Sequence, residues 1–232
     1  MITTKQETAI RDVLATMPEL AVGVGTREQA CSIAALNLAL TGTLTDIVPD
    51  CMSRVIGRWI IRVQDQMPAT IRDSRAWRDL LVLSAGTGRE HEAERMALVM
   101  AWMWDALPLV QPQADARGYG VAWATMLRER TVESARFAAA AADAAAAAAA
   151  YASADVFAYA AAAAAAYAAA AAAAYAYASA AAYADAAAAA DAAAAAAAYA
   201  AADVFADASA WTAIDPVGLL RRLVAVTDER AL

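Results

Sequence analysis

An alanine-rich segment decides the fold, and it repeats a short block: residues 151–159 read YASADVFAY and residues 199–207 read YAAADVFAD. The shared Asp-Val-Phe-Ala sequence returns after 48 residues, from Asp155 to Asp203, which is a multiple of eight. A fixed period of this kind indicates an internal structural repeat. Tyrosines fall on the same eight-residue grid at Tyr151, Tyr159, Tyr167, Tyr175, Tyr183 and Tyr199.

This segment is expected to be helical. Neither glycine nor proline occurs between Gly120 and Pro216. Alanine is the strongest helix former, because it loses no side-chain entropy in a helix, and it is depleted in strands. The sequence therefore predicts an alanine-rich helical array over residues 131–212.

The period also bears on the shape of the array. Eight residues turn an α-helix by about 800°, so each repeat advances about 80° around the helix and the tyrosines do not line one face. A single helical rod without an apolar stripe gains little stability beyond the helix propensity of its residues. We therefore expect the array to fold back as a hairpin, with a reversal near residues 176–184, and the alternative is one long helix.

The charge of the chain is uneven. The formal net charge is −7, and the segment from Phe137 to Leu220 contains seven aspartates and no lysine or arginine. Phosphate binding needs clustered cations, so nucleic acid is a poor partner for the array. The aspartates either keep an alanine surface in solution or form an acidic surface for a basic protein partner.

Membrane insertion is not expected, although the mean hydropathy is +0.41. Alanine contributes little to insertion, and each aspartate at the bilayer centre would cost about 3 kcal/mol. The first residues, Met1-Ile-Thr-Thr-Lys-Gln-Glu7, do not have the pattern of a signal peptide. The expected compartment is the cytoplasm.

Residues 1–130 predict a compact helical bundle, because large apolar side chains recur there at helical spacing. Thr26 with Gln29 fits a capping box for the second helix, and Asp50 fits a cap for the third. Helices are expected at about 4–17, 30–40, 51–67, 74–84 and 89–107, and from about 121 onward.

Residues 213–232 predict a final helix. Asp215 is a candidate cap, and Pro216 would occupy the first helical position, where its missing N–H costs nothing. Leu219, Leu220 and Leu223 give this helix an apolar face. We expect it to pack on the first domain.

Two glycine-rich turns, at residues 23–28 and 86–91, precede predicted helices and carry an arginine. Free N–H groups at a helix start bind anions, and an adjacent aromatic ring would suit a nucleotide-like ligand. Ordinary helix caps are the alternative, because neither turn matches a known phosphate-binding fingerprint. The residues assigned to this ligand site are Gly25, Thr26, Arg27, Gly86, Thr87, Gly88, Arg89 and Trp104.

The sequence gives little support for a catalytic site or a metal site. His91 lies between Glu90 and Glu92, where acidic residues are also expected at a helix start because of the helix dipole. Cys31 and Cys51 are the only cysteines and fit reduced core residues. We expect no catalytic residues, no metal and no cofactor. Of Trp102 and Trp104, we expect one in the core and one partly exposed.

The tyrosines and aspartates of the array are candidates for a protein-binding surface, because tyrosine is favoured at interfaces. The alternative is that the tyrosines simply pack the alanine helices. The residues assigned to partner binding are Tyr151, Asp155, Tyr159, Tyr167, Tyr175, Tyr183, Tyr199 and Asp203.

Runs such as Ala-Ala-Ala-Tyr-Ala-Ala with scattered aspartates resemble the alanine-rich helical repeats of bacterial and phage immunity proteins. The resemblance covers about a third of the chain and rests on composition. Those repeats usually carry arginine and histidine among the alanines, which this array lacks between residues 137 and 212. The resemblance implies an intracellular inhibitor or binder and assigns no functional residue.

The expected function is therefore that of a non-enzymatic intracellular binding or inhibitory protein that occupies a protein partner, as an immunity or phage counter-defence factor would. The alternative is a sponge that sequesters a small anionic, nucleotide-like ligand at the Gly-Arg helix starts. Self-association as a homo-oligomer is left open.

Overall fold

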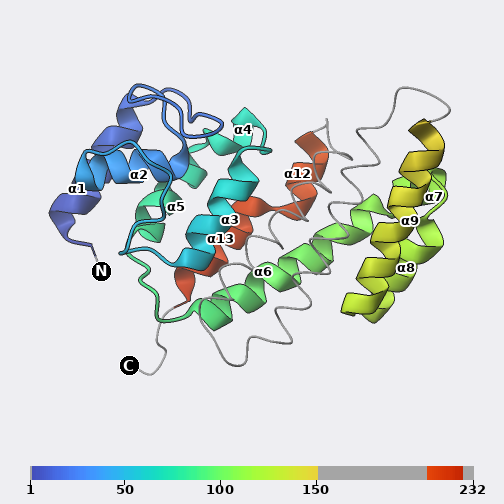
Figure 1. Cartoon of the computed structure of the whole chain (residues 1–232). Coiled ribbons are helices and arrows are strands. Elements are labelled where there is room, and N and C mark those ends of the chain that lie inside the picture. The colour runs from blue at the N-terminus through green and yellow to red at the C-terminus, as the bar shows by residue number, and fades with distance from the viewer. Residues whose placement is uncertain (1, 151–207, 227–232) are drawn as a thin grey trace. The chain divides into compact units, whose positions relative to one another are not determined.

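The computed structural model describes residues 2–150 and 208–226 (Figure 1). These residues form helices and connecting turns, with one isolated β-bridge between Gly25 and Ala30 and no strand. The expected all-helical fold is confirmed for them. The elements are α1 (Thr4–Thr16), α2 (Ser32–Thr41), α3 (Arg54–Gln64), α4 (Ala69–Arg72), α5 (Arg75–Ser84), α6 (Glu92–Ala106), the 3-10 helix η1 (Leu107–Val110), α7 (Gln111–Ala116), α8 (Gly120–Glu129), α9 (Val132–Ala150), α12 (Ala208–Ile214) and α13 (Pro216–Ala225).

The chain divides into two compact units, Met1–Leu98 with Asp215–Leu232, and Val99–Ile214. The division falls inside α6 and not near residue 130, where the sequence pattern places a domain boundary. The second half of α6 falls in the same unit as η1, α7, α8 and α9. Within that unit, α7 packs against η1 and α8, and α8 packs against α9.

In the first unit, helices α2 and α13 pack against α3. The rings of Trp59 on α3 and Trp77 on α5 lie 5.9 Å apart between centroids, and both side chains are fully buried. The apolar spacing seen in the sequence is therefore the core-facing side of this helix. Its buried apolar residues are Val55, Ile56, Trp59, Ile60 and Val63.

Two helix starts differ from the sequence prediction. Helix α3 is capped by Ser53, whose Oγ accepts a hydrogen bond from the Ile56 N–H at 3.2 Å, and not by Asp50. Helix α2 is capped by the Cys31 sulfur. The Thr26 hydroxyl does accept the Gln29 N–H at 3.3 Å, but this closes a turn that precedes the helix.

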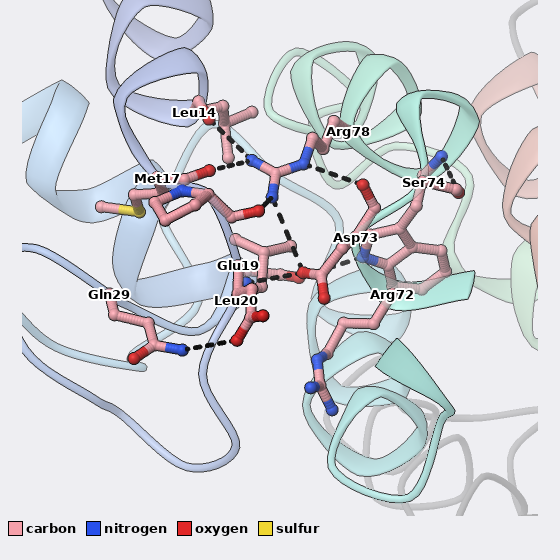
Figure 2. A network of polar contacts seen from close by, with 12 residues as sticks. Leu14, Met17, Glu19, Leu20, Gln29, Arg72, Asp73, Ser74 and Arg78 are labelled. Atoms are coloured by element: carbon pink, nitrogen blue, oxygen red, sulfur yellow. Dashed lines mark hydrogen bonds and ion pairs between the residues drawn. The ribbon is translucent and has the colours of Figure 1, made fainter. Parts of the chain in front are cut away.

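Arg78 of α5 holds the C-terminal end of α1 (Figure 2). Its Nη1 donates to the carbonyl oxygens of Leu14 at 2.7 Å and Met17 at 2.8 Å, which are left without partners where the helix ends. Its Nε donates to the carbonyl of Asp73, and an Asp73 carboxylate oxygen accepts the Leu20 N–H at 2.6 Å. The guanidinium of Arg78 therefore makes its hydrogen bonds within the protein.

Helix α13 packs against α5 and α3. Its start matches the sequence prediction, because the Asp215 carboxylate accepts the Gly218 N–H at 2.8 Å and Pro216 occupies the first turn. The apolar face consists of the fully buried Leu219, Leu220 and Leu223.

The second unit is built around two tryptophans. Trp123 of α8 is fully buried and donates its ring N–H to the Leu107 carbonyl at 3.2 Å. The Trp102 ring N–H donates to the carbonyl of Ile214 at the end of α12. Helix α9, the first part of the array, packs on α8 through small side chains, which let two helices approach closely. The buried alanines of α9 are Ala135, Ala138, Ala139 and Ala142.

Beyond α9, the greater part of the array, residues 151–207, lies outside the described residues, as does the expected reversal near residues 176–184. Helical structure of the array is thus confirmed over residues 132–150 and 208–212. In residues 2–150 and 208–226, no helix combines the length and the apolar character needed to cross a membrane.

Candidate functional site

A groove of about 880 Å³ lies in the first unit, between the start of α1, the end of α5, the turn at residues 86–91 and the end of α13. Its apolar walls include Ile2, Leu83 of α5 and Val224 of α13. The Leu83 side chain is 53% exposed. A concave apolar surface that leaves a leucine open to solvent is the usual character of a binding site.

The exposure of Leu83 follows from the sequence of α5. Leucines and valine occupy four successive positions, 80–83, and a helix cannot bury all four on one side. Leu80, Leu81 and Val82 face the core, with at most 6% exposure. The sequence predicts a helix over about residues 74–84 but does not single out Leu83 as exposed, although the run of four apolar residues is a signal for it.

Arg95 lies beneath this groove and is 1% exposed. Its guanidinium donates to the carbonyl oxygens of Leu223 at 3.2 Å and Val226 at 3.1 Å, at the end of α13. It also donates to the carbonyls of Thr87 at 3.1 Å and Gly88 at 3.4 Å. Arg95 therefore joins two walls of the groove. Burial lowers the pKa of Arg95, and the nearby carboxylates, Glu92 first, oppose this effect.

Charged side chains line the remaining groove surface. Glu7 is paired with Arg11 at 2.8 Å, and the His91 Nδ1 lies 3.9 Å from a Glu94 carboxylate oxygen. The guanidinium of Arg221 has no hydrogen-bond or ion-pair partner among the described residues. As far as the described residues line it, the groove thus combines apolar walls with the guanidinium of Arg221, which is available to a ligand.

Three of the N–H groups in the turn at residues 86–91, those of Gly86, Thr87 and Gly88, are used within the protein and are not open to an anion. The N–H groups of Gly86 and Thr87 donate to carbonyls at the end of α5, and the Gly88 N–H donates to the Cys51 carbonyl at 3.0 Å. Helix α6 begins at Glu92 and not at Arg89, because these bonds hold the turn in a non-helical path. The guanidinium of Arg89 bonds Asp50 at 2.9 Å.

The other turn, Gly25-Thr26-Arg27, is also not at a helix start. Gly25 has φ +76°, and a Cβ there would lie 2.2 Å from the Gln29 carbonyl oxygen, so only glycine fits. The Thr26 N–H donates to the Gln29 carbonyl at 2.9 Å, and an Arg27 nitrogen donates to the Gly42 carbonyl at 3.1 Å. This turn reverses the chain, and α2 begins only at Ser32.

Trp104 is buried at 8% exposure, and so is Trp102 at 3%. The expectation that one of these rings would be partly exposed is wrong. Arg130 covers Trp104, with its guanidinium carbon 5.4 Å from the ring centroid. Arg130 occupies the left-handed cap of α8, which the sequence pattern did not indicate. A cation already occupies the face that was expected to stack on a ligand.

The described residues contain no group of three or more His, Cys, Asp or Glu side chains that could hold a metal ion. All the array residues assigned to partner binding, from Tyr151 to Asp203, lie outside the described residues.

A buried carboxylate, which the sequence did not indicate as functional, follows the turn at residues 86–91 at the start of α6. Glu92, 4% exposed, accepts hydrogen bonds from the start of α3, through the Ser53 hydroxyl at 2.7 Å and the Arg54 N–H at 2.6 Å. An internal anion therefore already occupies this helix start. Because Glu92 lies 38 residues from Arg54 in the sequence, no local sequence pattern indicates this contact.

No protein-family model, no curated protein and no solved structure matches this chain.

Proposed function

We propose that this protein is a non-enzymatic binding protein that holds a segment of a protein partner in the groove between α1, α5 and α13. The observation that carries the proposal is the exposed Leu83 in an apolar concavity of about 880 Å³. The partner segment is an amphipathic helix, which places apolar side chains at every third or fourth position into such a groove.

The charged residues of the groove indicate the charge that the bound partner segment should carry. Arg221 lies in the groove without a described partner, so the bound segment carries a carboxylate opposite it. Apolar side chains of the segment lie against Leu83 and Val224. This occupant is an acidic, amphipathic helix and differs from the basic surface expected to face the array.

The chemistry of the groove supports binding over catalysis. Among its described lining residues, Thr87 carries the only hydroxyl, and there is no cysteine. The Thr87 hydroxyl donates its proton to the Ser84 carbonyl at 2.7 Å and accepts the Ser53 N–H. A hydroxyl held in this way has no base to activate it as a nucleophile.

The wider role, an immunity or counter-defence factor that inhibits by occupancy, rests on the resemblance of the array and is part of the same proposal. The alternative, an anion sponge at the two Gly-Arg turns, has less support. The N–H groups of Thr26, Thr87 and Gly88 are all used within the protein.

Photo-cross-linking in cells tests the proposal. A photoreactive amino acid replaces Leu83 in one variant and Val22 in the other, which is the matched control because its side chain is also exposed, at 59%, and does not line the groove. We expect a defined protein adduct from position 83 only.

The identified partner is then titrated as a purified protein. Leu83→Arg should weaken binding at least about tenfold, which corresponds to 1.4 kcal/mol, and Val22→Arg should not change it. Arg221→Glu should weaken binding, and reversal of one carboxylate on the partner helix should restore it. Equal adducts at both positions, or binding unaffected by Leu83→Arg, would rule the groove out.

A further inference from the structure

A second concavity, of about 390 Å³, lies on the first unit between the loop that precedes α3 and the outer side of α3. Three arginines line it: Arg54 and Arg58 from α3, and Arg89 from the turn before α6. Its apolar wall includes Ile47 and Ile61. We refer to it as the arginine pocket, and none of its residues lines the groove.

The guanidinium groups of this pocket keep hydrogen-bond donors that contacts within the protein do not satisfy. Arg54 and Arg58 lie one turn apart on α3 and are exposed, and their guanidinium groups have no partner among the described residues. Arg89 bonds Asp50 through Nη2 at 2.9 Å, but its Nη1 is buried without a hydrogen-bond partner. Arg78, by contrast, has all its bonds made within the protein (Figure 2).

The pocket is held in place by bonds from the core. The Asn37 amide nitrogen donates to the carbonyls of Thr45 at 2.8 Å and Ile47 at 2.7 Å, which fixes the loop. The Ile47 side chain is therefore held in solvent, at 72% exposure, beside the arginines. Glu92 neutralises the N-terminus of α3, so the positive character of the pocket comes from its side chains.

We propose that the arginine pocket binds a small organic phosphate, with the phosphoryl group between the three guanidinium groups and the organic part against Ile47. Guanidinium groups match phosphate oxygens in paired hydrogen bonds, and the open Nη1 of Arg89 gains an acceptor. Asp46 and Asp50 also line the pocket and oppose an anion, which leaves an excess of one positive charge among its lining residues.

Titration of the full-length protein with inorganic phosphate and with AMP, followed by calorimetry at low ionic strength, tests this site. We expect saturable binding of one ligand per chain, with AMP tighter than phosphate because its organic part contacts Ile47. Arg58→Ala should weaken both about tenfold, the loss of a charge-assisted bond, and Asp46→Asn should tighten both. Ile47→Ser should remove the advantage of AMP.

Arg222→Ala is the matched control, since Arg222 is exposed on α13 and lines neither the groove nor the arginine pocket. It should leave both affinities unchanged. The site would be refuted by an absence of saturable binding, by equal losses in Arg58→Ala and Arg222→Ala, or by AMP binding no tighter than phosphate. Asp46, Ile47, Arg58 and Arg222 are all exposed, so these variants leave the core intact, and circular dichroism verifies the fold.

Discussion

Glu92 Oε1 lies 2.6 Å from the backbone nitrogen of Arg54, so a side chain of α6 caps the first turn of α3. Its other oxygen accepts from the Val55 N–H at 3.1 Å and from the Ser53 hydroxyl. A helix start leaves N–H groups without partners and carries a partial positive charge, which explains why a buried carboxylate is tolerated here.

Replacing Glu92 with alanine should destabilise the protein. The N–H groups of Arg54 and Val55 would lose their acceptor, and each unsatisfied buried group costs about 1–3 kcal/mol. We expect the free energy of unfolding, measured by urea denaturation, to fall by about 2–4 kcal/mol. Glu94→Ala is the control, because Glu94 lies in the same helical turn but is exposed. Equal effects of the two substitutions would contradict this role.

Arg95→Met should also destabilise the first unit. The substitution leaves the carbonyls of Leu223 and Val226 without their donor and releases the end of α13 from the turn at residues 86–88. We expect a loss on the order of 3 kcal/mol in urea denaturation. Arg222→Met, an exposed arginine on α13, should change stability by less than about 0.5 kcal/mol. A stable Arg95→Met variant would show that the four carbonyls are satisfied in another way.

Gly57 on α3 should resist replacement by alanine for a reason outside its own helix. A Cβ at this position would lie 2.4 Å from a methyl carbon of Val48, although alanine favours a helix by about 1 kcal/mol over glycine. Overpacking costs about 1–3 kcal/mol, so Gly57→Ala should lower stability. In a Val48→Ala background the same substitution should raise it. A double-mutant cycle by urea denaturation gives the sign, and additive effects would exclude the clash.

The thiol of Cys31 should make stability depend on pH in the alkaline range. Burial raises the pKa of Cys31, opposed by hydrogen bonds from Ala34 and Ile33. The unfolded chain then loses this proton first, so stability is complete below the usual value of 9.0 and falls as the pH rises above it. The stability of wild type relative to Cys31→Ser should decline over that range. A constant difference would contradict a raised pKa.

Local sequence predicted most of the helices of the described chain. The spacing of Val55, Trp59 and Ile60 placed the buried face of α3, and Asp215-Pro216 placed the start of α13. These signals act within one or two turns, where propensity, capping and periodicity operate. The short helices η1 and α7 were not predicted, because each carries in its first turn a proline, Pro108 or Pro112, and such prolines usually mark connections.

The candidate sites depended much less on local sequence. The glycine-rich turns suggested anion sites, but the Gly88 N–H donates to the carbonyl of Cys51, far away in the sequence, and the Thr87 N–H donates to the neighbouring Ser84 carbonyl. Trp104 suggested a ligand platform, but Arg130 covers it. For Gly88 and Trp104 the partner is distant in the chain, whereas the Thr87 N–H donates to a carbonyl only three residues away.

By itself, the sequence determined that the described chain is helical and where its main apolar faces lie, because these follow from side-chain size and the 3.6-residue period. Only the tertiary structure decided which polar groups remain open. The side chains of Glu92 and Arg95 are hydrogen-bonded to backbone groups of other elements. The side chains of Arg54, Arg58 and Leu83 are exposed to solvent. Which groups pair in hydrogen bonds depends on how the elements are arranged in three dimensions. The periodicity of the sequence does not specify this pairing.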